Sequence, residues 1–340
     1  MAIVDGFDVH RKQITFDYLD TDSGEVRRGK ISPATRVELR QWLERFAGRP
    51  AAFAVEGCTG WRFVVEELDA VGIEAHVAEP ADTAALRGPK KRAKTDQLDA
   101  RHLRQLLQAG TIPESWIPPA HVLEARTKVR LYKTLVDQRT SWIQRIHAQL
   151  FHHGAPPQPG LLTTAGRMQL KATYLSPSGT EAVDIALHMI EATTAASEPL
   201  RREIATIARH EPGCRALQAH YGVGAVTSVA IWAELGDCCR FSSSADAVRH
   251  TGLDITVRSS DSKRTRGQLA RQGPPVLRWA LFEAAKCAAR RSSPDHDYYL
   301  EVRSRLGANR ATLSVARKLA RRCHHTLRAL GDDAFAPPKS

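Results

Sequence analysis

The chain has 340 residues, of which 42% are hydrophobic and 25% are charged, a balance typical of folded proteins. Its 49 Lys and Arg residues outnumber 37 Asp and Glu residues, and the net charge of +12 indicates a polyanionic partner. No apolar run approaches the ~20 residues of a membrane-spanning helix, and the six cysteines form no CxxC pair, which excludes a membrane span and argues against a structural zinc site. We expect two or three domains in a cytoplasmic protein.

The first part of the chain alternates between strand and helix patterns. Runs of period-2 apolar spacing at 2–9, 13–19 and 26–32, separated by turn residues, predict an antiparallel meander. We then expect a helix over 33–46, a strand over 51–56, a helix over 59–72, a strand over 73–79 and a helix from about Asp96 to Leu107. The first of these helices is expected to bury Val37, Leu39, Trp42, Leu43 and Phe46. The order βββαβαβα is that of an RNase H-like α/β fold, which we predict for residues 1–112.

Pro113, Pro118 and Pro119 mark the end of this domain. Beyond them, apolar residues recur every seven positions at Val122, Val129, Val136, Ile143 and Leu150, and a companion row at Ala125, Tyr132 and Ile146 is interrupted by Arg139. The pattern predicts one long helix with a coiled-coil seam, ended by APPQPG (155–160). A second helix over roughly 180–210, bent or interrupted at Pro199, would fold back against it. We therefore predict a helical coiled-coil arm over 113–210 that assembles chains as dimers or tetramers; the alternative is a helix of an ordinary bundle.

Residues 211–335 are basic and mainly helical, and we assign them to a third domain. HYGVGAVTSVAIWAEL (220–235) has the Gly-x-Gly turn and following helix of a helix-hairpin-helix, which binds phosphate through backbone N–H groups. A plain helix start explains it nearly as well. SSDSKRTRGQLARQG (259–273) is expected to be a polar basic loop, and helices are expected over about 275–291 and 309–330.

Four carboxylates hold informative places in the first domain. Asp8 lies near the end of the first strand and Glu56 at the end of the fourth, so adjacent central strands would bring them together. Asp96 and Asp99 share one helix face because they are three residues apart. Such a cluster needs cations, and Mg²⁺ suits carboxylates; two such ions ~4 Å apart can promote phosphodiester cleavage. Taken alone, each acid is also explained as a turn or helix-cap residue.

A basic run, RGPKKRAK (87–94), precedes the acidic helix. Its cationic side chains are suited to hold a nucleic-acid backbone beside a metal site. The candidates are Lys90, Lys91, Arg92 and Lys94.

Three segments, GFDVHRK (6–12), AVEGCTGW (54–61) and KTDQLDA (94–100), resemble the acidic blocks of the DEDD transposases of bacterial insertion sequences, recombinases described as guided by a bridge RNA. Downstream segments are similar to the C-terminal domain of that family. They are GVGAVTSVAIWAELGD (222–237), RF (240–241), TGLDITVRSSDSKRTRGQLARQG (251–273) and VLRWAL (276–281). The order and spacing of the blocks agree over most of the chain.

The resemblance implies a RuvC-like N-terminal domain in which Asp8, Glu56, Asp96 and Asp99 hold Mg²⁺. It also implies a serine nucleophile, which matches Ser260. Asp261 and Ser262 replace the two glycines that follow this serine in the family, and Ile255 replaces a usual proline, so Ser259 remains a rival and Ser262 a weaker one. The basic residues expected to bind nucleic acid here are Arg258, Lys263, Arg264, Arg266 and Arg271.

By this resemblance the protein is a site-specific transposase or recombinase of the bacterial nucleoid. It would excise and insert element DNA through a covalent phosphoserine intermediate, with a structured noncoding RNA choosing target and donor. The residues alone do not demonstrate RNA guidance, and they leave open whether acids and serine meet within one chain or between subunits. Two alternatives remain: a RuvC-like junction nuclease for which Ser260 is dispensable, and a non-enzymatic nucleic-acid-binding scaffold.

Overall fold

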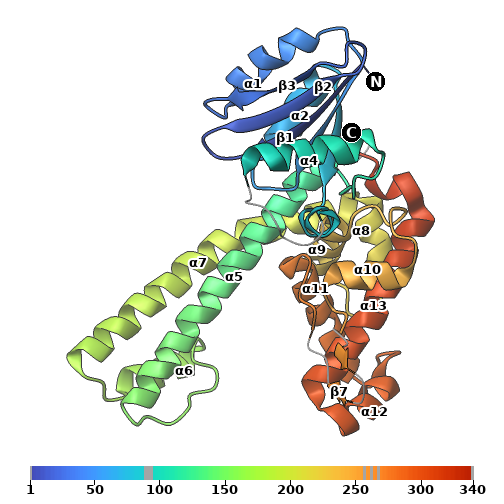
Figure 1. Ribbon diagram of the computed structural model, residues 1–340. Coiled ribbons are helices and arrows are strands. Elements are labelled where there is room, and N and C mark those ends of the chain that lie inside the picture. Colours follow the sequence, from blue (N-terminus) through green and yellow to red (C-terminus); the bar gives the residue numbers. More distant parts are fainter. Residues whose placement is uncertain (1, 88–94, 256–257, 261–262, 266–268, 338–340) are drawn as a thin grey trace. The chain divides into compact units, whose positions relative to one another are not determined.

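The computed structural model describes residues 2–87, 95–255, 258–260, 263–265 and 269–337 (Figure 1). Contacts divide the chain into two compact units, Met1–Ile117 and Pro118–Ser340. Within the described ranges, none of the helices is both long and apolar enough to span a membrane.

The first unit contains a five-stranded mixed sheet in the order β3-β2-β1-β4-β5. Its strands are β1 (Ile3–Val9), β2 (Ile14–Asp20), β3 (Val26–Ile31), β4 (Ala51–Glu56) and β5 (Glu74–Ala78). The first three strands are antiparallel neighbours, whereas β4 runs parallel to β1 and β5 runs parallel to β4. Helices α1 (Arg36–Leu43, extended by a 3-10 turn at Glu44–Phe46) and α2 (Trp61–Ala70) connect the later strands. The predicted order of strands and helices is confirmed.

One face of the sheet carries an aromatic core. Its rings lie with centroids 4.6–6.2 Å apart and belong to Phe7, Phe16, Tyr18, Trp42, Phe46 and Phe53. Helix α1 contributes Leu39, Trp42 and Leu43 as predicted, but the prediction for Val37 is wrong, because its side chain is 61% exposed. Positions three and four residues after Val37 hold Arg40 and Gln41, so Val37 lies on the solvent face of the helix.

The other face of the sheet is covered by α4 (Asp96–Gln108), which packs across β1 and β2 (Figure 1). The close approach depends on Gly6, since a Cβ there would lie 2.5 Å from the Arg104 nitrogen and would also collide with the Ala100 carbonyl oxygen. Arg104 donates from Nε to Asp17 Oδ1 at 2.6 Å, and both side chains are buried. The middle of α4 is thereby fixed against β1 and β2. A further short helix, α3 (Pro80–Leu86), was not predicted.

The second unit begins with a long helical hairpin. Helices α5 (Ala120–His152) and α7 (Pro177–His210) lie side by side, with α6 (Thr164–Ala172) between them in the chain (Figure 1). Pro199 lies inside α7 without ending it. The predicted fold-back of the second helix is confirmed, whereas α6 was not predicted. The seam residues Val122, Ala125, Val129, Ile146 and Leu150 are buried, but Val136 and Ile143 are only half-buried, and the coiled-coil seam stays a prediction.

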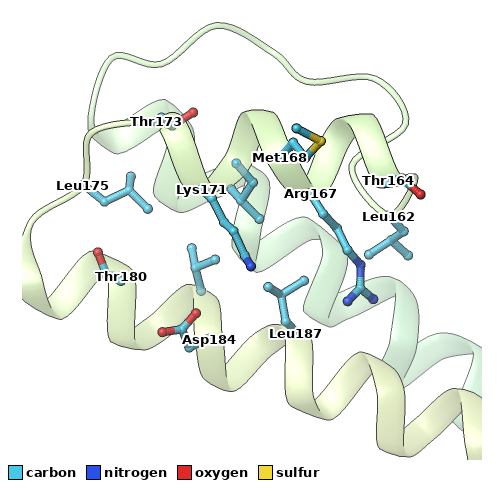
Figure 2. A pocket seen from close by; sticks show the side chains of 12 residues that line it. Leu162, Thr164, Arg167, Met168, Lys171, Thr173, Leu175, Thr180, Asp184 and Leu187 are labelled. Carbon is cyan, nitrogen blue, oxygen red and sulfur yellow. The ribbon is translucent and has the colours of Figure 1, made fainter.

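A cavity of about 630 Å³ lies at the end of this hairpin between α6 and α7 (Figure 2). Its lining is mainly apolar, with Leu162, Leu175 and Leu187 among its residues. Arg167 and Lys171 extend from α6 toward α7 in Figure 2, and Arg167 pairs with Glu191 at 2.7 Å. None of the site residues predicted from the sequence lines this cavity.

Helix α9 (Ala225–Leu235) is buried among α5, α7, α8 and α11, and further elements complete this unit. They are α8 (Pro212–Leu217), α10 (Ser244–Thr251), β6 (Arg258–Ser260), β7 (Lys263–Thr265), α11 (Pro275–Ala285), α12 (His296–Leu306) and α13 (Ala308–Leu330), with 3-10 turns at Lys286–Ala289 and Gly331–Phe335. The fully buried Trp232 donates from Nε1 to the Ala334 carbonyl at 2.7 Å. The expected loop over 259–273 is wrong in part, because β6 and β7 pair as an antiparallel hairpin.

Candidate active site

Asp8 and Glu56 stand at neighbouring strand ends. In the parallel pairing of β1 and β4, Phe7 lies opposite Val55, and both side chains enter the aromatic core. Side chains alternate along a strand, so the next residues, Asp8 and Glu56, point to the opposite face, which α4 covers. Both predicted carboxylates therefore face the same helix.

Asp96 and Asp99 occupy the first turn of α4. Thr95 caps this helix by accepting a hydrogen bond from the Leu98 backbone nitrogen at 3.3 Å. Asp99 is buried, while the Asp96 side chain keeps 43% of its surface exposed. The helix dipole stabilises both carboxylates at this N-terminus. The Asp99 carboxylate is enclosed by the structure, whereas the Asp96 carboxylate can be reached from solvent.

His10 joins Asp8 to Asp96. Its Nε2 lies 3.2 Å from Asp8 Oδ2 and 3.4 Å from Asp96 Oδ1. Ligand atoms of these three residues lie within 4.8 Å of one another. Gln13 adds a hydrogen bond from Nε2 to Asp96 Oδ2 at 3.1 Å. The turn after β1 thus contacts Asp96 in the first turn of α4 through two side chains, His10 and Gln13, and His10 also contacts Asp8.

Electrostatics link Asp99 to this corner, whereas Glu56 acts on the neighbouring Cys58. Burial raises the pKa of the Asp8 carboxyl, the charges of Asp99 and Asp96 raise it further, and His10 opposes the shift. Asp99 forms an ion pair with Arg87, the residue that follows α3. Burial also raises the pKa of the Cys58 thiol, with added contributions from the charges of Glu56 and Asp8. Within the described residues Glu56 is not part of the three-residue cluster, and its charge, like that of Asp8, acts on the Cys58 thiol.

The cluster fits a divalent cation. Two carboxylates and an imidazole nitrogen already lie within ligand distance of one another, on elements held by the packing at Gly6 and by the Arg104–Asp17 pair. Carboxylate oxygens suit Mg²⁺, and imidazole is also accepted by transition-metal ions. Neither His10 nor Gln13 was predicted. The available signal for His10 was its position two residues after Asp8, which places it on the same face of an extended strand end.

Ser260 ends β6, and its backbone pairs with Lys263 across the β6–β7 hairpin. Ser259 pairs with Arg264, and Arg258 with Thr265. Several predicted residues lie outside the described part of the chain: Lys90, Lys91, Arg92, Lys94, Asp261, Ser262 and Arg266. Arg271 is described and exposed, with a positive φ of 56°. Asp8 and Asp96 of the first unit are thus brought together, with Asp99 close enough for its charge to act on Asp8, and the serine is placed on a short hairpin of the second unit.

Two family models match separate parts of the chain. One, for DEDD transposases of the IS110 type, matches residues 6–153 and includes all four predicted acids. The other, described as the transposase IS116/IS110/IS902 family, matches residues 214–300 and includes Ser260. Together the two segments span well over half of the chain.

Known transposases are similar along most of the sequence. The transposase of insertion sequence element IS1111A from Coxiella burnetii is 21% identical over 86% of this chain and 82% of its own length. A probable family 20 transposase from Pseudomonas aeruginosa is 22% identical over 93% of this chain and 94% of its own length. The putative transposase y4qE from Sinorhizobium fredii is 26% identical over 77% of this chain, which covers 65% of that protein.

Proposed function

The chain belongs to the IS116/IS110/IS902 family of insertion-sequence transposases, and we propose that it excises and inserts element DNA through a covalent serine–phosphate intermediate. The observation that carries this proposal is the meeting of Asp8, His10 and Asp96 at the end of the central strand, inside the segment that the DEDD model matches. Family membership makes the chain a DNA transposase; the assignment of residues to its chemistry is the proposal.

In the proposed site Asp8, Glu56, Asp96 and Asp99 hold Mg²⁺. Bound Mg²⁺ would neutralise charge on the scissile phosphate and on the departing oxygen. The chain's own residues prepare this site. His10 and Gln13 orient Asp96, and Arg87 balances the buried charge of Asp99. A preformed arrangement of this kind reduces the reorganisation that binding and reaction require.

The proposed nucleophile is Ser260. Its Oγ attacks a backbone phosphorus atom, an Oγ–P bond forms, and the P–O bond to the departing sugar oxygen breaks. Ser260 loses its hydroxyl proton and the departing oxygen gains one, so one ester replaces another. Attack on this ester by a sugar hydroxyl of another strand then joins the strands and restores Ser260, without ATP. Ser259 remains the rival nucleophile.

The basic residues named from the sequence would hold nucleic-acid backbone near these groups. They are Lys90, Lys91, Arg92, Lys94, Arg258, Lys263, Arg264, Arg266 and Arg271. The net charge of +12 supports a role in binding more than one nucleic acid. We include in the proposal a structured noncoding RNA that selects target and donor, in a protein that acts at the bacterial nucleoid.

The proposed division of labour follows three domains, 1–112 with a RuvC-like acidic site, 113–210 as an arm, and 211–335 with the serine. We include in the proposal that the α5–α7 hairpin assembles chains as dimers or tetramers. Its seam residues, such as Val129 and Ile146, are buried within the chain, so the exposed apolar side chains of these helices, Leu131, Phe151 and Ile185, would make the contact.

The test is a denaturing-gel assay for protein attached to DNA, with the element junction, the flanking transcript and Mg²⁺. The native chain is compared with Ser260→Ala, Ser259→Ala and Asp96→Asn. We expect an adduct from the native chain and from Ser259→Ala, and none from the other two. Free cleaved ends from Ser260→Ala, with no adduct from any variant, would replace the serine mechanism with a metal-dependent nuclease. Metal-independent binding without cleavage would indicate a scaffold.

A further inference from the structure

The segments that flank the Ser260 hairpin in the chain pair with each other through a separate set of backbone hydrogen bonds. The chain leaves α10 through residues 252–255 and returns to α11 through residues 269–273. Ile255 and Leu269 form an antiparallel bridge, Ala270 donates its backbone N–H to Asp254 O at 3.0 Å, and Arg271 donates to Gly252 O at 3.1 Å. We call these two segments the stem. In the chain, one segment of the stem precedes β6 and the other follows β7.

Arg278 of α11 connects both ends of the stem. Its Nη1 donates to the Gly273 carbonyl at 2.8 Å and to the Thr251 carbonyl at 3.3 Å. Thr251 is the last residue of α10, and Gly273 lies just before α11. One guanidinium group therefore ties the point where the chain enters the stem to the point where it leaves.

Arg317 of α13 holds the entering segment from another helix. Its Nε donates to the Leu253 carbonyl at 2.5 Å, and Leu253 itself is 1% exposed. Burial lowers the pKa of both guanidinium groups, Arg278 and Arg317, but they stay charged at neutral pH. Charged donors make the stronger class of hydrogen bond to a carbonyl, so both contacts are suited to hold backbone in place.

The stem is also too close-packed to accept side chains at its glycines. Gly252 has φ +67°, and a Cβ there would lie 2.8 Å from Arg278 Nη1 and collide with the Gln272 carbonyl. Gly273 has φ +111°, and a Cβ there would collide with the His250 carbonyl. These positions require glycine because of both their backbone conformation and the space around them. Arg278 thus contacts backbone that has little freedom to shift.

We propose that Arg278 and Arg317 are positioning residues that clamp the stem and thereby fix where the β6–β7 hairpin presents its serine to DNA. Strands of three residues each make a hairpin that is at best marginally stable by itself. A nucleophile must nevertheless be held close to its reactive geometry, because small displacements cost large factors in rate. The clamp supplies that order from two helices of the same unit. This role rests on the proposed function of the hairpin serine.

The first test measures hairpin order without any reaction. Trypsin cleavage after Lys263, Arg264 and Arg266 is followed by mass spectrometry in the native chain, Arg278→Ala, Arg278→Lys and Arg317→Ala. Arg201→Ala is the matched control, since Arg201 pairs with Glu198 on the exposed surface of α7. We expect cleavage to accelerate about tenfold in each Ala variant, because the backbone carbonyls at the stem lose their charged donors. Cleavage of Arg201→Ala should be unchanged. Circular dichroism verifies that each variant is folded. If Arg278→Ala does not fold, Arg278→Lys takes its place in the comparison of cleavage rates.

The second test measures adduct formation by the same variants. We expect the adduct rate to fall about tenfold or more in Arg278→Ala with DNA affinity retained, and to recover in part when guanidinium ion is added at low millimolar concentration. Added guanidinium should not rescue Ser260→Ala, and it would not repair general unfolding.

The outcomes separate the two hypotheses. If trypsin cleaves Arg278→Ala and Arg317→Ala at the same rate as the native chain, the clamp is overturned, whatever the adduct yield. Faster cleavage with an unchanged adduct rate would overturn the positioning role. If the native chain itself forms no adduct, the serine mechanism fails, while the proteolysis result still decides whether the stem is clamped.

Discussion

The corner that holds the acids and the hairpin that carries Ser260 are built in different ways. Asp8, Glu56, Asp96 and Asp99 lie on regular elements of the first unit, at strand ends and in the first turn of a helix that packs on the sheet. The hairpin of the second unit consists of two three-residue strands. The contacts described near it are hydrogen bonds from Arg278 and Arg317 to backbone carbonyls at the stem. Ligands for a metal need fixed mutual distances, whereas a nucleophile needs a fixed support from which to meet its substrate.

The largest effect is expected at Gly6, where α4 packs against β1. Gly6→Ala puts a methyl group against the backbone of α4, which must then shift away from β1. We expect a loss of about 3 kcal/mol in the free energy of unfolding of the first unit, and a loss of metal affinity with it. Urea unfolding and calorimetric titration with Mn²⁺ measure the two effects.

Gly224→Ala is the control for that substitution, because a Cβ at Gly224 meets nothing within 4 Å and its φ of −97° is ordinary. Equal stability of Gly6→Ala and the native chain would show that α4 is not held tightly against the acid corner.

The stability of the second unit, which contains the hairpin and the stem, should depend on pH through His250 of α10. Burial and the charge of Arg240 lower the pKa of His250 to about 4. In the unfolded chain a histidine has a pKa of about 6.5, so the unfolded state binds the proton more readily than the folded state. The contribution of His250 to stability is therefore complete above that pH and is lost as the pH falls toward about 4. We expect His250 to account for a loss of about 3 kcal/mol in the free energy of unfolding between pH 7 and pH 4.

Urea unfolding of the native chain and of His250→Gln between pH 7 and pH 4 checks this. The variant should show a shallower decline over that window. Parallel pH dependences of the two proteins would mean that His250 titrates normally in the folded state.

A smaller effect is expected at Gln13, which orients Asp96 without contacting the other acids in any hydrogen bond described here. Removal of an outer partner of a metal ligand lowers metal affinity by about tenfold or more. Calorimetric titration of Gln13→Ala with Mn²⁺ should show this weakening with little change in stability. Gln105→Ala, on the exposed side of α4, is the control; identical affinities in both variants would remove Gln13 from the site.

Sequence patterns predicted the elements whose apolar spacing is strong. Strands β1 and β4 follow from alternation and buried runs, and the acids at their ends could be named before any coordinates. Val37 was placed wrongly because an apolar residue beside a helical stripe is not always part of it. His10 and Gln13 were missed because their role depends on how the β1–β2 turn meets α4, a contact between segments more than eighty residues apart.

The hairpin was harder to foresee. Arg258, Ser259 and Ser260 carry no apolar alternation, and neither do Lys263, Arg264 and Thr265, so the segment has the composition of a loop. Its strands form where the stem brings the two segments together. The donors that hold the stem come from Arg278 and Arg317, on helices that follow the hairpin in the chain.

The most direct test of the account is to identify the residue that becomes attached to DNA. After reaction with the element junction, the flanking transcript and Mg²⁺, the protein is digested and the peptide bearing a nucleotide is sequenced by mass spectrometry. We expect a phosphodiester at Ser260 in the native chain and no modified peptide from Asp96→Asn. A nucleotide on any other side chain, or an undiminished adduct from Asp96→Asn, would contradict the joint action of acid corner and hairpin serine.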